Sequence, residues 1–201
     1  SPNMPNSLGA NWGDSIAGGT PGAANSIEDS GRLPLVASVL HRPAMPGPED
    51  LVTIQAHVVN GDGISEVTVY YRRDLIRGEP WAEARMSAVA SVPLDGHAGQ
   101  VYEAQLPPMS DGTVVEFYVV ATGIGGGKRF WPEPVMVDGG TLSQEANLLY
   151  QVNESAHEGT FPEYSIVMTA VEAAKLEAIM TGDLHQQTDA QVNATFVSQD
   201  P

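Results

Sequence analysis

From Leu33 onward, hydrophobic and polar residues alternate in short runs, which is the pattern of β-strands with one buried face. The clearest run is residues 52–58, in which every second side chain is hydrophobic. We expect that strand to turn its valine, isoleucine and alanine side chains toward a core. Similar runs follow at residues 64–72, 81–92, 102–106, 113–122 and 128–137.

Turn-forming sequences separate these runs. They are Asn-Gly-Asp-Gly at 60–63, Asp-Gly-His-Ala-Gly at 95–99 and a glycine-rich stretch at 123–127. About seven strands at this spacing, with no helical stretch between them, predict an immunoglobulin-like antiparallel β-sandwich. We expect this sandwich to span residues 33–138.

The segments on either side differ from this pattern. Residues 1–32 are rich in Gly, Asn, Ser and Pro, which predicts an extended linker or the tail of a preceding domain. Within 139–201, Thr169 and Glu172 form a capping box ahead of one short helix at 170–180. We expect 139–201 to be a linker and the incomplete start of another domain, with strands at 148–152, 164–168 and 189–197. The predicted fold class is therefore mainly β, with an extended N-terminal segment and one short C-terminal helix.

Composition excludes several functions. The chain has 9 basic and 25 acidic side chains and a net charge of −16, which argues against binding nucleic acid. No run approaches the roughly 18 apolar residues of a transmembrane helix, so we expect no membrane insertion. The absence of cysteine removes thiol catalysis and thiolate metal sites. The acidity suits a protein that must stay soluble, and it favours a secreted or cell-surface location.

Two polar stretches invite chemical interpretations. The glycines at 123–127 precede Lys128, but Thr122 and Arg129 stand where a phosphate-binding loop needs Gly and Ser or Thr. A hairpin turn is the better interpretation. Asn60, Asp62 and Glu66 offer oxygen atoms to calcium, although solvated turn residues are the simpler explanation because a dedicated site needs six or more oxygens. We expect no catalytic residues and no cofactor.

The three tryptophans, Trp12, Trp81 and Trp131, have two interpretations. They offer a platform on which sugar rings stack, which would make the chain a carbohydrate-binding module. They also suit the core and edges of a β-sandwich, which needs a few large aromatic side chains.

Three stretches resemble known families. Residues 11–26, NWGDSIAGGTPGAANS, resemble the closing stretch of bacterial lamin-tail domains. Residues 106–121 resemble the fibronectin type III region through strand F, with Val115 where that family usually has tyrosine, so we expect an immunoglobulin-like domain in the broader sense. Residues 164–197 look like the start of a CotH-type spore-coat kinase domain.

This order of modules resembles that of bacterial CotH-type multidomain proteins. The resemblance implies that the kinase's catalytic residues lie beyond Pro201. We therefore expect a non-catalytic module for spacing, adhesion or assembly, whose partners are neighbouring domains of the same parent chain. A carbohydrate-binding module and an accessory part of an active kinase are the alternatives. Self-association or strand addition through the termini is a further expectation.

Overall fold

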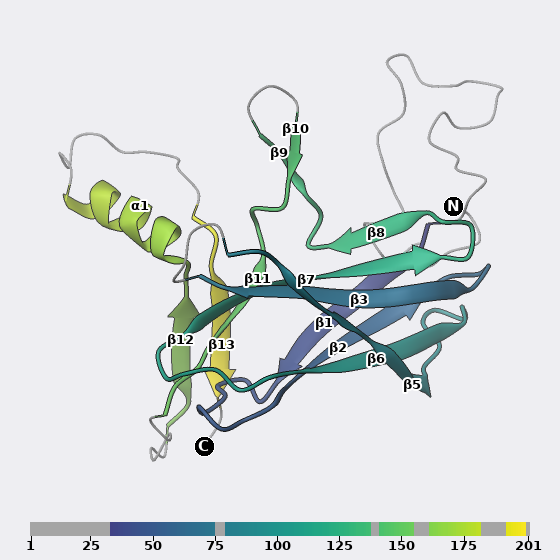
Figure 1. Ribbon diagram of the computed structural model, residues 1–201, viewed down its shortest axis with the longest axis horizontal. Coiled ribbons are helices and arrows are strands. Elements are labelled where there is room, and N and C mark those ends of the chain that lie inside the picture. The colour runs from purple at the N-terminus through teal and green to yellow at the C-terminus, as the bar shows by residue number, and fades with distance from the viewer. Residues whose placement is uncertain (1–32, 75–78, 138–140, 155–160, 182–191, 200–201) are drawn as a thin grey trace.

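The computed structural model describes residues 33–74, 79–137, 141–154, 161–181 and 192–199. Within these residues the predicted class is confirmed: the chain is mainly β, its sheets are antiparallel, and it has one short helix (Figure 1). The N-terminal segment 1–32, with Trp12 and the lamin-tail-like stretch, lies outside the described residues.

Two larger sheets contain most of the described strands. The first has the order β1 (Leu35–Arg42), β2 (Val52–Val59), β6 (Gly99–Leu106) and β5 (Ser87–Ser91). The second contains β4 (Ala82–Arg85), β3 (Ile64–Arg73) and β7 (Val114–Gly123), with β8 (Lys128–Trp131) and β11 (Leu148–Gln151) both paired to β7.

A single hydrophobic core joins the two sheets. The expected face of β2 is buried in it, and Val67 and Val69 of β3 with Phe117 and Val119 of β7 are at most 1% exposed. Full burial of a side chain of this size contributes about 1.5–3 kcal/mol. The alternation read from the sequence therefore positions these strands correctly.

The chain passes from one sheet to the other at Met86. This residue lies between β4, which pairs with β3, and β5, which pairs with β6. Its backbone N–H donates a 2.8 Å hydrogen bond to the Val67 carbonyl, and its side chain enters the core. Residues 81–92, which form one run in the sequence, are thus two strands in different sheets.

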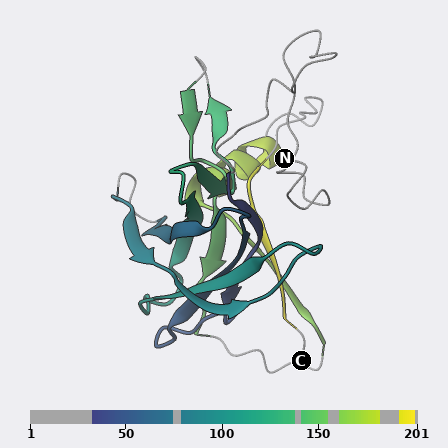
Figure 2. The same cartoon turned by 90° about the vertical axis from the view of Figure 1, so that its right-hand side faces the viewer.

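The outer edge of β7 is shared by two strands. β8 pairs with residues 119–122 and β11 with residues 114–117. Between them a hairpin of β9 (Val135–Val137) and β10 (Thr141–Ser143) projects away from the sheets (Figures 1 and 2). Tyr150 of β11 is fully buried in the core, so the sheet is completed by residues after position 138.

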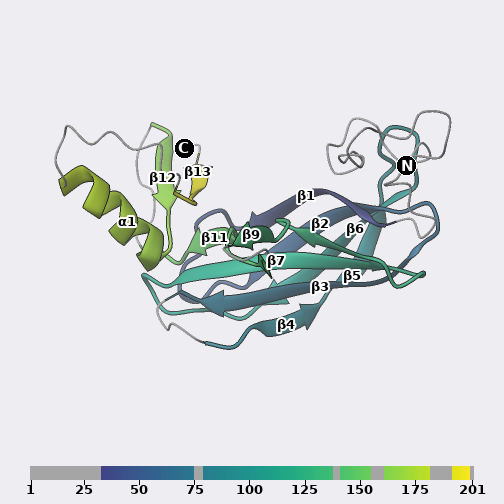
Figure 3. The same ribbon diagram turned by 90° about the horizontal axis from the view of Figure 1, so that it is seen from above.

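The remaining elements lie at one end of the sheets (Figures 1 and 3). β12 (Glu163–Val167) pairs with β13 (Thr195–Gln199), and α1 (Ala170–Thr181) lies between them in sequence. We call these three elements the terminal unit. The Thr169 hydroxyl accepts a 3.2 Å hydrogen bond from the Glu172 N–H, which confirms the predicted helix start. In the described part of the chain, no helix has the length and apolar character needed to cross a bilayer.

Candidate functional site

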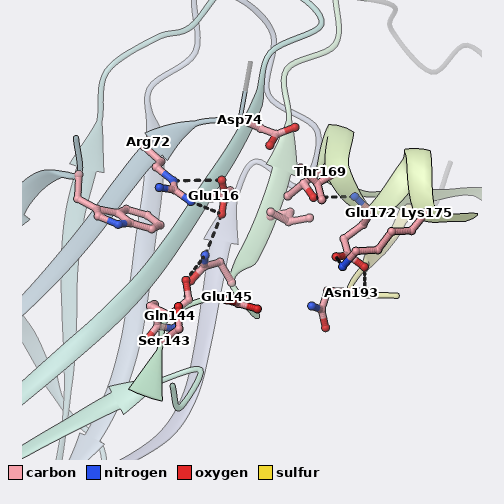
Figure 4. Close-up of a pocket in the computed structure, with 14 residues that line it drawn as sticks. Arg72, Asp74, Glu116, Ser143, Gln144, Glu145, Thr169, Glu172, Lys175 and Asn193 are labelled. Atoms are coloured by element: carbon pink, nitrogen blue, oxygen red, sulfur yellow. Dashed lines mark hydrogen bonds and ion pairs between the residues drawn. The ribbon is translucent and has the colours of Figure 1, made fainter. Parts of the chain in front are cut away.

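A cavity of about 560 Å³ lies where the second sheet meets the terminal unit. One wall comes from β3 and β7, another from the connection between β10 and β11, and a third from the first turns of α1 (Figure 4). We call it the junction cavity and describe its walls in turn.

The sheet wall is built around a buried carboxylate. Glu116 is 5% exposed on the side of β7 opposite the core, and it accepts hydrogen bonds from Arg72 Nε at 3.1 Å and Nη2 at 3.3 Å. Asn147 Nδ2 donates a further bond of 2.8 Å to the same carboxylate. Because a buried charge without partners costs several kcal/mol, these donors are what allow Glu116 to occupy the site.

The same network holds the connection after the β9–β10 hairpin. Gln144 Nε2 donates to Asn147 Oδ1 at 3.2 Å and to the Pro132 carbonyl at 3.0 Å. Asn147 therefore ties this connection to Glu116, while Gln144 ties it to the segment that leaves β8. The cavity wall formed by residues 143–147 is fixed by side-chain amides.

An aromatic cluster continues the sheet wall. Trp81 lines the cavity, and its ring meets Tyr118 edge to face, with centroids 4.8 Å apart at 81°. The Arg72 guanidinium lies 4.3 Å from the centroid of the same ring. Tyr70 stacks on Tyr118 at 5.1 Å, and burial raises the pKa of the Tyr118 hydroxyl. Trp81 is thus held in place on this face by neighbours from two strands.

The helix wall contains a second buried carboxylate, Glu172. It is 7% exposed and accepts hydrogen bonds from Lys175 Nζ and, at 3.0 Å, from the Asn193 backbone N–H. Burial alone would raise the pKa of Glu172, but the hydrogen bond from Lys175 and that from Asn193 outweigh it, so the pKa lies below its usual value. Glu172 therefore connects α1 to the segment that enters β13.

Direct contacts attach the terminal unit to the sheets beside this cavity. Asp74 Oδ2 accepts a 2.5 Å hydrogen bond from the Ala170 N–H, and the Leu149 N–H donates a 3.1 Å bond to Thr195 Oγ1. Leu149 also forms an apolar cluster with Val167 and Val197. The cavity therefore lies where the terminal unit is attached to the second sheet.

The structure separates the tryptophans proposed for sugar binding. Trp81 lines the junction cavity, whereas Trp131 packs against the hydrophobic core and Trp12 lies outside the described residues. Tyr70 accompanies Trp81 on the outer face, while Tyr71 packs against the core, as strand alternation requires.

The residues proposed for calcium have other contacts. Asn60 Oδ1 accepts a 3.0 Å hydrogen bond from the Asp62 N–H, and its Nδ2 donates to the Gly63 carbonyl at 3.0 Å. A carboxylate oxygen of Glu66 lies 3.9 Å from Arg85 Nε. No group of three metal-binding His, Asp or Glu side chains occurs among the residues that the structure describes. Asn60 is explained by its turn, and calcium binding stays a prediction.

The sequence interpretation missed Glu116, Arg72 and Asn147. A signal existed for Glu116, which is the only charged residue in the hydrophobic run TVVEFYVVAT. Asn147 gave no signal, because its partner lies 31 positions earlier in the chain.

No protein-family model matches this chain, and no curated protein matches it either.

Proposed function

We propose that the chain is a non-catalytic structural module, an immunoglobulin-like β-sandwich that holds the terminal unit in a fixed orientation. Strand order supports the fold assignment. In immunoglobulin constant-type domains one sheet has the order A-B-E-D and the other C-F-G. The order β1-β2-β6-β5 corresponds to the first, and β3-β7-β8 to the second, with β4 added beside β3.

The observation that carries the structural role is the attachment of the terminal unit. Two hydrogen bonds, from Ala170 to Asp74 and from Leu149 to Thr195, join it to the second sheet. Each contributes about 0.5–1.5 kcal/mol. The apolar cluster around Leu149 adds Ala44 and Met45, so the connection between β1 and β2 also takes part. A flexible linker would make few contacts of this kind.

The chemistry of the junction cavity supports a non-catalytic role. A general acid or base must be accessible to its substrate. Glu116 instead bonds to Arg72 and Asn147, and Glu172 bonds to Lys175. These carboxylates stabilise the junction.

A neighbouring domain of the parent chain is the partner that we propose for this module. On one side of the paired strands β12 and β13, Tyr164, Ile166 and Phe196 are each 64–65% exposed, although Val167 and Val197 are buried. Strands that are apolar on both faces are typical of strands covered on both sides. The resemblance of 164–197 to a CotH-type domain favours a kinase-like neighbour in a secreted or surface-attached bacterial protein.

Residual dipolar couplings measured by NMR test the fixed orientation. We expect one alignment tensor to fit the amides of β2, β3, β6 and β7 together with those of α1, β12 and β13. The double variant Asp74→Ala/Leu149→Ala should require two tensors, whereas Glu49→Ala, an exposed control, should require one. Two independent tensors in the unaltered chain would show that the module is a flexible tether and would overturn the proposal.

A further inference from the structure

The junction cavity has the size of a small-molecule site. Its volume of about 560 Å³ falls within the roughly 300–1,000 Å³ of ligand pockets. Ser143, Glu145 and Asn193 line it with side chains that take no part in the hydrogen bonds described above. Their hydroxyl, carboxylate and amide groups supply both donors and acceptors. The walls are held by other residues, so these three are available to a ligand.

The charge of the cavity selects among ligands. Four carboxylates line it against two cations, Arg72 and Lys175. With a net charge of −16 on the whole chain, the site disfavours phosphates, nucleotides and acidic polymers. The ligand should therefore be neutral or cationic.

Trp81 decides between these two classes. An aromatic ring attracts a cation over its face, but here the guanidinium of Arg72 already occupies such a position 4.3 Å from the ring centroid. A ligand cation would meet a like charge at that position. A neutral ligand that has apolar C–H groups beside hydroxyl groups fits an indole flanked by hydrogen-bonding side chains.

We propose that the junction cavity binds a neutral oligosaccharide. In this arrangement a sugar ring contacts the part of the Trp81 indole that lines the cavity beside Arg72, and its hydroxyls bond to Ser143, Glu145 and Asn193. The ligand would contact both the second sheet and the terminal unit, because Trp81 precedes β4 and Asn193 precedes β13. This site is independent of the orientation role proposed above, which needs no ligand.

Affinity electrophoresis tests this proposal in native gels that contain a soluble polysaccharide. The probes are a mixed-linkage β-glucan, a galactomannan and a xylan, which are neutral, and polygalacturonate, which is anionic. We expect at least one neutral polymer to retard the chain and polygalacturonate to leave its mobility unchanged. Isothermal titration calorimetry with spermidine tests whether the cavity binds a cationic ligand, and we expect no binding.

The variants assign the binding to the cavity. Trp81→Ala should weaken binding by about tenfold or more, a loss of about 1.4 kcal/mol. Tyr164→Ala, which removes an exposed aromatic side chain from β12, should leave binding unchanged. Glu145→Ala and Ser143→Ala remove side chains that make none of the hydrogen bonds within the cavity walls. If Trp81→Ala does not fold, weaker binding by these two variants tests the site instead. The proposal would be overturned if no neutral polymer retarded the chain, or if the Trp81, Glu145 and Ser143 variants were all retarded as much as the unaltered chain. Retardation by polygalacturonate alone, or binding of spermidine alone, would also overturn it.

Discussion

Asp74, directly after β3, accepts a hydrogen bond from the backbone N–H of Ala170, the first residue of α1 and 96 positions later in the chain. The first N–H groups of a helix lack partners within the helix, and a carboxylate is a favourable acceptor for them. Thr169 satisfies the Glu172 N–H locally, while Asp74 satisfies that of Ala170 from another part of the fold. The start of α1 is therefore specified jointly by sequence and by tertiary structure.

Replacing Asp74 with alanine should loosen the terminal unit without unfolding the core. The lost capping interaction is worth about 0.5–2 kcal/mol. We expect amide hydrogen exchange to speed up in the first turn of α1 and in β12 and β13, while protection in β2, β3 and β7 stays as before. Equal acceleration in the core strands would mean that Asp74 supports the whole fold instead.

Replacing Arg72 with alanine should be strongly destabilising, because it leaves Glu116 buried with only Asn147 as a side-chain donor. Breaking one side of a buried ion pair costs about 3–5 kcal/mol, and the partial exposure of Arg72 places our expectation toward the lower figure. Urea denaturation gives the change in the free energy of unfolding. Glu133→Ala is the matched control. The Glu133 side chain, which pairs with Arg129, is 49% exposed, so loss of this ion pair should cost less than about 1 kcal/mol of unfolding free energy.

His41 should make stability fall as the pH drops below about 6.5, the ordinary pKa of histidine. Burial against Phe117 and Tyr150 lowers the pKa of its imidazole, although a hydrogen bond to the Ala44 carbonyl acts in the opposite direction. The unfolded chain therefore binds a proton at a higher pH than the folded chain, and stability falls as the pH drops below the unfolded value of about 6.5.

Urea midpoints for the unaltered chain and for His41→Gln test this assignment. We expect the difference between pH 7.5 and pH 5 to shrink in the variant. Glu172, whose pKa is lowered, contributes stability that is lost only below its unfolded pKa of about 4.5, outside this window. An unchanged pH dependence in His41→Gln would refute the assignment.

Gly99 and Gly125 form a matched pair for a test of packing. A Cβ on Gly99 would lie 2.4 Å from the Val92 carbonyl oxygen and 2.6 Å from His57 Nε2, whereas a Cβ on Gly125 would meet nothing within 4 Å. Gly99→Ala should therefore cost about 1–3 kcal/mol and lower the Tm, while Gly125→Ala should leave the Tm nearly unchanged. Thermal unfolding followed by circular dichroism distinguishes the two, and similar Tm values would show that the backbone around Gly99 yields easily.

Strand positions could be read from the sequence because alternation is a local property. Residues 52–58 show this, and so does the helix start at Thr169. Residues 128–137 were expected to form one strand, but they form β8 and β9, which pair with different partners. Pro132 and Pro134 lie between the two, and proline cannot donate a hydrogen bond to a sheet.

The junction cavity could not be read in the same way. Its walls join Arg72, Glu116, Asn147 and Glu172, which are far apart in sequence. Acidic side chains at such positions give the same local pattern whether they face solvent or accept hydrogen bonds in a buried network. Only the packing of the terminal unit and the β10–β11 connection distinguishes these two cases.

The division of the β7 edge between β8 and β11 separates the pairing of the sheet from the segment that joins these two strands. Because each strand pairs with its own half of β7, the β9–β10 hairpin between them can change in length or composition while the sheet keeps its pairing. The connection that follows this hairpin places Gln144 and Asn147 in the cavity wall. Ser143, at the end of β10, also lines the cavity, so a change at this position would alter the cavity without removing a pairing of β7.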